Sequence, residues 1–292
     1  MKKLISFLLA AVLFCGTLSG CSASAPLTSD IQTNAQSSAE DSQKEDGEPI
    51  VIRVGASITP HSEILKAADE LLREKGYQLD IVEFDDYILP NLNVESGDLD
   101  ANFFQHRPYL ENFNEENGTH LVSVVVVHYE PFGLYPGKTT SLDSLADGAQ
   151  IAIPNDGTNE ARALLLLESF GLITLKEDIG MTATILDIEE NPKNLQITEM
   201  AAAQLARSLQ DVDMAVINGS YALQAGLNAS TDALAVETSD SEAVQKYVNV
   251  VAVREGHEND EGIQALVEVL KSDEIKQFIE DTYQGSVVPY EE

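Results

Sequence analysis

The sequence predicts an α/β protein with two lobes of similar size. From Ile50 onward, segments with the two-residue period of strands alternate with segments that have the period of helices, which is the pattern of a doubly wound open sheet. Over residues 128–138, two prolines and two glycines interrupt this alternation, and a chain can pass there from one lobe to another. An apolar segment over 248–255 predicts a strand that returns to the first lobe. The first lobe is therefore expected to comprise 50–130 plus 248–292 and the second 131–247, with a cleft between them. The alternative is one continuous α/β domain.

The expected elements of the first lobe follow from local patterns. In 61–76, five apolar residues share one helical stripe and a glycine stands at the end, where helices favour it. Gly97 and Gly118 are expected to end two further helices, the second of which opens at Pro108. The apolar run 121–127 is long enough for a strand buried on both faces. In order, we expect a strand at 50–56, a helix at 61–76, a strand at 78–84, a short helix before Gly97, a strand at 99–106, a helix at 108–118 and a strand at 121–127.

The second lobe and the C-terminal part of the chain repeat the alternation. We expect strands at 149–156, 182–188 and 212–218, each followed by a helix, at 159–172, 201–210 and 220–227 respectively. After the return strand, two amphipathic helices at 261–270 and 272–283 complete the chain.

The N-terminal residues differ from the rest of the chain. Lys2 and Lys3 precede an apolar run over 4–14 that is too short to cross a bilayer and is typical of a signal peptide. Leu18-Ser19-Gly20-Cys21 resembles the bacterial lipobox, in which the cysteine after the cleavage point receives diacylglycerol. We therefore expect a signal peptide at 1–20, lipidation of Cys21 and a flexible acidic tether over 21–49.

The composition excludes several classes of function. The 292 residues include 49 Asp and Glu against 17 Lys and Arg, giving a net charge of −32. Nucleic-acid binding depends on basic side chains and is excluded, and an anionic membrane surface would repel the chain, so that only a lipid anchor should hold it there. The sequence has no GxSxG, GxGxxG, GxxxxGK[ST] or HExxH motif, and its five histidines lack the spacing of metal ligands. We therefore expect a protein that is not an enzyme and has neither a metal nor a cofactor.

Seven blocks of sequence, in order along the chain, resemble one family. They are FDDYILPN (84–91), GDLDANFFQHRPYL (97–110), HYEPFGLYPGK (128–138), IPNDGTNEARALLLL (153–167), AAQLARSL (202–209), VDMAVING (212–219) and YVNVVAVR (247–254). Together they are similar to the methionine-binding lipoproteins of bacterial ABC importers, the NlpA lipoprotein family.

This resemblance implies a two-lobed, type II periplasmic-binding-protein-like fold with the ligand in the cleft. It implies that the chain captures L-methionine or a close derivative and delivers it to an ABC permease with a cytoplasmic ATPase. The mature protein is expected to be a monomer that a lipid anchor holds on the outer face of the cell membrane.

Arg162 is a candidate for binding the ligand carboxylate. It lies one turn into a predicted helix whose start, Asn155-Asp156-Gly157-Thr158-Asn159, is rich in capping residues. A bidentate guanidinium and helix amides there can hold a carboxylate together. The residue pattern alone favours a surface ion pair with Glu160 or another acid, whereas the resemblance favours the ligand clamp.

Aromatic residues are candidates for the wall around a thioether, because sulfur packs favourably against rings. Phe103, His106 and Tyr109 recur every three residues across a strand-to-helix junction, and Tyr87 stands at another strand end. Strand alternation sends Phe103 and Phe104 to opposite sides, and we choose Phe103 for the cleft. The alternative places Phe103 in the core.

Asn218 and Asn249 are the remaining candidates. Asn218 follows a buried strand and Asn249 lies at the start of the return strand, so each amide can meet the ammonium or the carboxylate of an amino acid. Turn formation at Asn218 and a hinge hydrogen bond at Asn249 are the alternatives, and the resemblance favours ligand contact for both. Three functions stay open at this point: a solute-binding protein for methionine or another amino acid, a lipid-anchored hydrolase with an unrecognised site, and an adhesion or scaffold lipoprotein.

Overall fold

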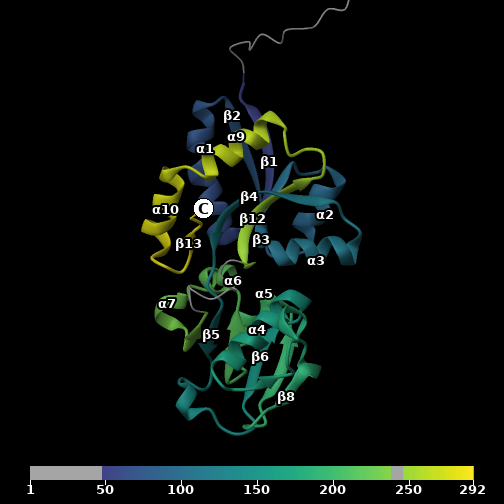
Figure 1. Ribbon diagram of the computed structural model, residues 1–292. Coiled ribbons are helices and arrows are strands. Elements are labelled where there is room, and N and C mark those ends of the chain that lie inside the picture. Colours follow the sequence, from purple (N-terminus) through teal and green to yellow (C-terminus); the bar gives the residue numbers. More distant parts are fainter. Residues whose placement is uncertain (1–47, 238–245, 292) are drawn as a thin grey trace, which may run out of the picture. The chain divides into compact units, whose positions relative to one another are not determined.

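The computed structural model describes residues 48–237 and 246–291, which form two α/β lobes, each built on its own sheet (Figure 1). The predicted signal peptide, Cys21 and nearly all of the predicted tether lie outside the described residues. None of the helices in the described ranges is long and apolar enough to cross a membrane.

The sheet of the first lobe has six strands in the order β13-β4-β12-β3-β1-β2. β1 pairs in parallel with β2 and β3, whereas β12 runs antiparallel between β3 and β4. The N-terminal part of the described chain thus forms β1 to β4 of this sheet. After the second lobe the chain returns as β12, which lies between β3 and β4. The strands are β1 (Ile50–Ser57), β2 (Tyr77–Phe84), β3 (Ala101–His106), β4 (Leu121–Tyr129), β12 (Val248–Arg254) and β13 (Val288–Pro289).

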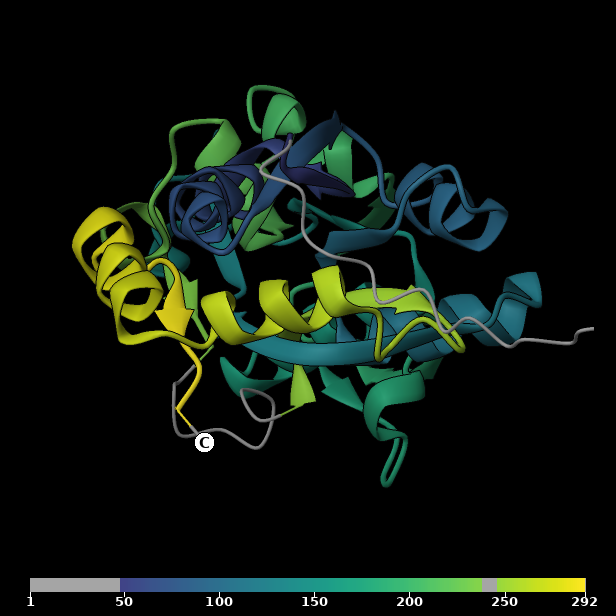
Figure 2. The ribbon, with the colours of Figure 1, turned by 90° about the horizontal axis from the view of Figure 1, so that it is seen from above.

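Helices cover both faces of this sheet. The core on one face joins the strands to α1, α9 and α10, and the smaller core on the other joins them to α2 and α3. The two C-terminal helices α9 and α10, yellow in Figure 2, contact each other. Gly97 and Gly118 end their helices with φ of 83° and 65°, a conformation that favours glycine, as predicted. The helices are α1 (Glu63–Glu74), α2 (Leu89–Ser96), α3 (Arg107–Asn117), α9 (Glu261–Leu270) and α10 (Asp273–Tyr283).

The sheet of the second lobe has five strands in the order β11-β5-β10-β6-β9. α4 packs on one face through Ala161, Leu164 and Leu167, and α5 packs on the other through Leu205. The strands are β5 (Gly133–Pro136), β6 (Gln150–Pro154), β9 (Gln196–Met200), β10 (Met214–Ile217) and β11 (Ala235–Val236), beside a small pair of β7 (Thr174–Leu175) and β8 (Ile188–Glu190). The helices are α4 (Gly157–Ser169), α5 (Ala202–Ser208), α6 (Gly219–Gln224) and α7 (Ala229–Asp232).

Two expectations about the strands are wrong. The strand predicted at 182–188 is wrong: the structure has two 3-10 turns there, Gly180–Thr182 and Ile185–Asp187, and a capping box between Thr184 and Asp187 begins the second of them. The strand that pairs with β6 is β9, an edge strand whose partly exposed Gln-Ile-Thr-Glu-Met sequence carries little apolar signal. β4 is also not buried on both faces, because Ser123 is exposed and three of its other residues are only partly buried.

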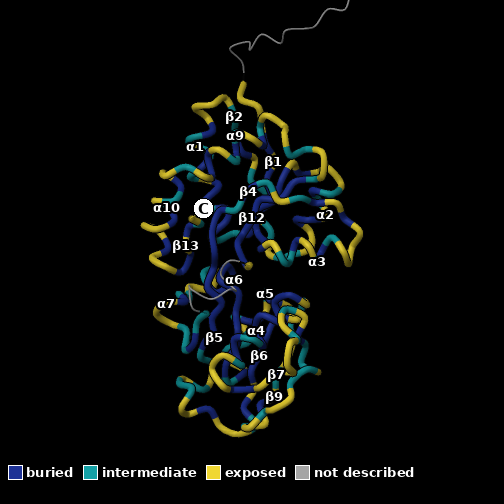
Figure 3. The backbone as a smooth tube through the Cα atoms, in the orientation of Figure 1, coloured by how far each residue is buried: buried dark blue, intermediate teal, exposed yellow. Residues whose placement is uncertain are grey.

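The strand ends bring one set of residues to the region between the sheets. β3 ends at His106, β6 ends just before α4, and β10 ends just before Asn218. β4 ends at Tyr129 and β5 begins at Gly133, so the chain passes from one sheet to the other over 130–132. This passage and the start of β12 are buried, and they appear dark blue between the lobes in Figure 3. Ligands of open α/β sheets bind beyond the carboxyl ends of strands, so this region is where a site is expected.

Candidate functional site

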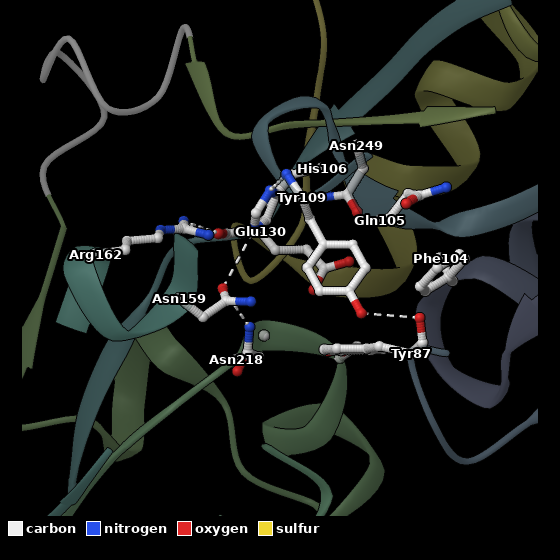
Figure 4. A pocket seen from close by; sticks show the side chains of 12 residues that line it. Tyr87, Phe104, Gln105, His106, Tyr109, Glu130, Asn159, Arg162, Asn218 and Asn249 are labelled. Carbon is white, nitrogen blue, oxygen red and sulfur yellow. Dashed lines mark hydrogen bonds between the residues drawn. The ribbon is translucent and has the colours of Figure 1, made fainter. Parts of the chain in front are cut away.

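A pocket lies between the two lobes (Figure 4). Its empty volume is about 350 Å³, which includes space open to solvent. Direct hydrogen bonds join the lobes across it, from Tyr87 Oη to Ser220 Oγ at 2.7 Å and from His106 Nε2 to Asn159 Oδ1 at 3.1 Å. The lining residues are Tyr87, Phe104, Gln105, His106, Tyr109, Glu130, Asn159, Arg162, Asn218, Gly219, Ser220 and Asn249.

Most of the predicted site residues lie on this pocket. The structure brings together Tyr87, His106, Tyr109, Arg162, Asn218 and Asn249. They come from both lobes and are up to 162 positions apart in the chain (249 − 87). That these residues contact a ligand stays a prediction.

Phe103 is the exception, and the choice between the two phenylalanines has to be corrected. Phe103 is fully buried in the core of the first lobe, where its ring centroid lies 4.5 Å from that of His61 and 5.3 Å from that of His128. Phe104 lines the pocket instead. The spacing of three that linked Phe103 to His106 is helical, but both residues belong to β3, where side chains two apart share a face. Phe104 and His106 therefore point to the same side.

Aromatic rings form one wall of the pocket. The ring of Tyr87 lies 5.7 Å from Phe104, 5.8 Å from Tyr109 and 4.9 Å from Tyr221, measured between centroids. Tyr109 Oη donates to the carbonyl oxygen of Tyr87 at 3.0 Å, which holds the two rings in place. Burial raises the pKa of both phenols above the usual range, so they stay neutral. The wall thus offers several ring faces and edges to an apolar side chain.

An amide network forms the floor on the side of the second lobe. Asn159 Oδ1 accepts from Asn218 Nδ2 at 2.9 Å and from His106 Nε2 at 3.1 Å. Because His106 Nδ1 accepts from the backbone N–H of Tyr109, the network assigns the proton to Nε2. Burial, followed by the nearby Arg162 charge, lowers the pKa of His106 to about 3, so the ring is neutral. Within the described residues Asn218 Oδ1 is buried without a hydrogen-bond partner, so it is free to accept from a ligand.

Arg162 is buried, but its bidentate partner belongs to the protein. Its Nε donates to Glu237 Oε1 at 2.8 Å and its Nη2 to Glu237 Oε2 at 2.6 Å, while Nη2 also donates to the carbonyl oxygen of Glu130 at 2.9 Å. The prediction that Arg162 holds the ligand carboxylate through a bidentate pair is therefore wrong for Nε and Nη2. These two nitrogens form the alternative that the sequence also allowed, an ion pair with another acid of the protein. Among the described residues only Nη1 of this guanidinium has no hydrogen-bond partner, which leaves it for the pocket.

The surroundings of Arg162 keep it charged. Burial alone would lower its pKa, but the charge and hydrogen bonds of Glu237 outweigh burial and raise it above the usual range. Its guanidinium carbon also lies 4.2 Å from the ring centroid of Tyr247 and 4.7 Å from that of Phe132. Phe132 belongs to the passage between the sheets, and Tyr247 directly precedes β12. Glu160, which the sequence analysis considered as an ion-pair partner of Arg162, instead accepts a hydrogen bond from the backbone N–H of Ile185.

Sequence reasoning missed Glu130 and its two histidine neighbours. Glu130 Oε1 lies 2.9 Å from His128 Nε2 and 3.4 Å from His61 Nε2, and all three side chains are buried. His61 Nε2 is also 3.0 Å from Asn249 Oδ1. Burial lowers the pKa of His61 to about 4 and that of His128 to about 3. The sequence did contain a signal that could have identified Glu130. It is an acidic residue at the point where the chain passes between the two predicted lobes, and such a segment has to border the cleft.

The fold and the site define a class. Two α/β lobes with a pocket between them, lined from both sides, form the architecture of a type II periplasmic-binding-protein-like solute-binding protein. Residues 52–291 match the model of the NlpA lipoprotein family, and the chain belongs to that family.

Relatives agree with this assignment. The chain is 42% identical to the D-methionine-binding lipoprotein MetQ of Salmonella typhimurium, over 84% of this chain and 90% of the relative. It is 41% identical to the methionine-binding lipoprotein MetQ of Bacillus subtilis over the full length of both. A solved nutrient-binding protein from Burkholderia cenocepacia, bound to methionine, is 43% identical, with a TM-score of 0.78 over 82% of this chain and 100% of that one. These relatives are named for binding and not for catalysis, as was predicted for this chain.

Proposed function

We propose that this chain is the solute-binding lipoprotein of an ABC importer, which captures methionine outside the cytoplasm and delivers it to a permease with a cytoplasmic ATPase. The observation that carries the proposal is one pocket in which an aromatic wall faces a buried arginine, a buried glutamate and three asparagines. A free amino acid offers a carboxylate, an ammonium and a side chain, and this set of groups matches all three. The names of the relatives support methionine as the amino acid.

We propose that the ligand lies across the pocket with its two ends on different groups. The thioether packs against the rings of Tyr87, Phe104 and Tyr109. The carboxylate meets Nη1 of Arg162 near the asparagine network, and Asn249 receives the remaining polar contacts from the side of the first lobe.

We further propose how the protein is placed in the cell. The lipobox resemblance and the lipoprotein family support cleavage after Gly20, lipidation of Cys21 and a tether up to residue 49. The protein then works as a monomer on the outer face of the cell membrane. Its lobes, 50–130 plus 248–292 and 131–247, close on the ligand about the passage at 130–132.

Calorimetry on ligand-stripped protein tests the proposed function. Methionine is expected to bind at one site per chain without turnover, and alanine and serine are expected to bind much more weakly because they leave the aromatic wall empty. Norleucine should be somewhat weaker than methionine, since it lacks sulfur. Titrations with the L and D forms decide between the enantiomers. Absence of any methionine binding would reject the proposal, and conversion of an amino-acid derivative would favour a hydrolase instead.

The aromatic wall allows a matched comparison of two neighbouring residues. Phe104→Leu is expected to weaken methionine binding by roughly 2- to 12-fold, about 0.5–1.5 kcal/mol, because the ring contacts the proposed thioether position. Phe103→Leu is expected to lower the melting temperature and leave affinity within about twofold, since Phe103 is buried in the core and does not line the pocket. Titration and thermal unfolding of both variants test this assignment, and the reversed pattern would return Phe103 to the ligand wall.

A further inference from the structure

The charges around the pocket do not cancel. Arg162 and Glu237 form a buried pair that is neutral as a unit. The three histidines nearby are neutral, because burial lowers their pKa to about 3 or 4. Glu130 lines the pocket and has no cationic partner of its own among the described residues, and the partly buried Asp156 adds a second acid behind Asn159. The pocket is therefore better balanced by a ligand group that carries positive charge.

The surroundings of Glu130 hold its carboxylate as a hydrogen-bond acceptor. Within the described residues His128 Nδ1 is buried without a hydrogen-bond partner, which assigns its proton to Nε2, because a bare lone pair costs less than an unpaired N–H. Nε2 then donates to Glu130 Oε1 at 2.9 Å. The backbone N–H of Ser220 donates to the same carboxylate, and Asn249 engages His61 at 3.0 Å beside it. Burial raises the pKa of Glu130, and an ammonium placed against it would lower that pKa again.

The backbone leaves room for this carboxylate. A Cβ atom on Gly219 would lie 2.7 Å from Glu130 Oε2, so that only glycine allows the carboxylate to occupy its present position. Gly219 and Glu130 both line the pocket, and the approach of the two lobes brings them together.

A metal ion is a weaker explanation of the same residues. Ligand atoms of His61, His128 and Glu130 lie within 4.8 Å of one another, which a metal ion would require. Coordination through His128 Nε2 would, however, move the ring proton to Nδ1, for which the described residues provide no acceptor. A carboxylate supported by neutral imidazole donors fits the hydrogen bonds better.

We propose that Glu130 receives the ammonium of the ligand, and that recognition depends on this cation more than on the ligand carboxylate. The second part follows because Glu237 already occupies Nε and Nη2 of Arg162 and offsets its charge, so that a ligand carboxylate gains only what Nη1 and neighbouring amides provide. The inference rests on the proposed function and narrows its substrate class to compounds with a free, cationic α-amine. Carboxylate-modified derivatives such as amides belong to this class, and N-acylated or deaminated ones do not.

Three ligands separate the two ends without any change to the protein. Methionine, methioninamide and 4-(methylthio)butanoate share a side chain, but the second lacks the carboxylate charge and the third lacks the ammonium. At a pH where the amine of methioninamide is protonated, the deaminated acid is expected to bind at least about 30-fold more weakly than methionine. Methioninamide is expected to bind more weakly than methionine by a smaller factor than the deaminated acid does. Tighter binding of the deaminated acid than of methioninamide would overturn the inference.

Glu130→Gln assigns the effect to one residue. This substitution keeps the shape of the side chain and removes its charge, so methionine affinity should fall by about 30-fold or more while that of 4-(methylthio)butanoate stays within about threefold. Glu111→Gln, at an exposed position of α3, is the matched control and should change neither. Equal losses for both ligands, or none, would overturn the assignment to Glu130. If the wild-type protein does not bind methionine at all, the proposed function itself is rejected. This outcome is distinct from a rejection of the role of Glu130, which requires wild-type binding. If Glu130→Gln does not fold, the three-ligand comparison still decides whether the ammonium dominates.

Discussion

Replacing Arg162 with alanine is expected to weaken methionine binding by roughly 30- to 5000-fold, about 2–5 kcal/mol. Two effects act in the same direction. The ligand carboxylate would lose its proposed contact with Nη1, and Glu237 would be left in the site as an unpaired buried acid that repels the carboxylate. Arg162→Lys should recover only part of the affinity, since an ammonium lacks the planar fork that Glu237 binds. Calorimetry of the folded variants measures these differences, and wild-type affinity in Arg162→Ala would remove Arg162 from the site.

The same substitution should also destabilise the ligand-free protein. Breaking a buried ion pair by removing one partner typically costs about 3–5 kcal/mol. Among the described residues, the Glu237 carboxylate would then keep only its bonds from Tyr129 Oη and from the backbone N–H of Phe132. In the double variant Arg162→Ala, Glu237→Gln, the buried charge is gone, so stability and methionine affinity should both recover in part. The affinity that stays lost measures the contribution of Nη1 itself. Arg53→Ala, in an exposed pair with Asp80, is the control and should change the free energy of unfolding by less than about 1 kcal/mol.

Mild acid is expected to destabilise the ligand-free protein strongly. Three buried histidines have pKa values near 4 for His61 and near 3 for His106 and His128, below the usual 6.5. As the pH falls below 6.5, the unfolded chain takes up protons at these rings and the folded chain does not, so stability is lost until the folded pKa values are reached. At pH 5 each ring costs about 2 kcal/mol relative to neutral pH, or about 6 kcal/mol together.

Carboxyl groups modify this curve at its acid end. Burial raises the pKa of Glu130 and Asp156, so the folded chain binds protons there before the unfolded chain does, which offsets part of the loss. The steepest decline should therefore lie between about pH 6.5 and 4.5. Urea unfolding from pH 7 to 5 measures the slope. His106→Gln should reduce it by about a third. Equal stability at pH 7 and pH 5 would contradict the neutral, buried state of these rings.

Local patterns in the sequence were sufficient for much of the fold. The apolar stripe of α1, the glycines that end α2 and α3, and the return strand β12 all lie where their periodicity predicts them. Such features depend on neighbours a few residues away, and a sequence displays these directly. β9 escaped detection because an edge strand with partly exposed faces needs no apolar alternation.

The features of the site also differ in whether local sequence or tertiary packing determines them. The sequence alone determined the acidic charge that excludes nucleic acids, the strand ends that face the cleft, and the blocks that carry the family resemblance. Only the tertiary structure decided that Phe104 and not Phe103 faces the pocket, that Glu237 occupies the fork of Arg162 from 75 positions away, and that Glu130 lies between His61 and His128. Each of these depends on which side chains meet after distant segments pack and on which hydrogen bonds burial then requires. Neither the period of a strand nor the residue types within one motif contain that information.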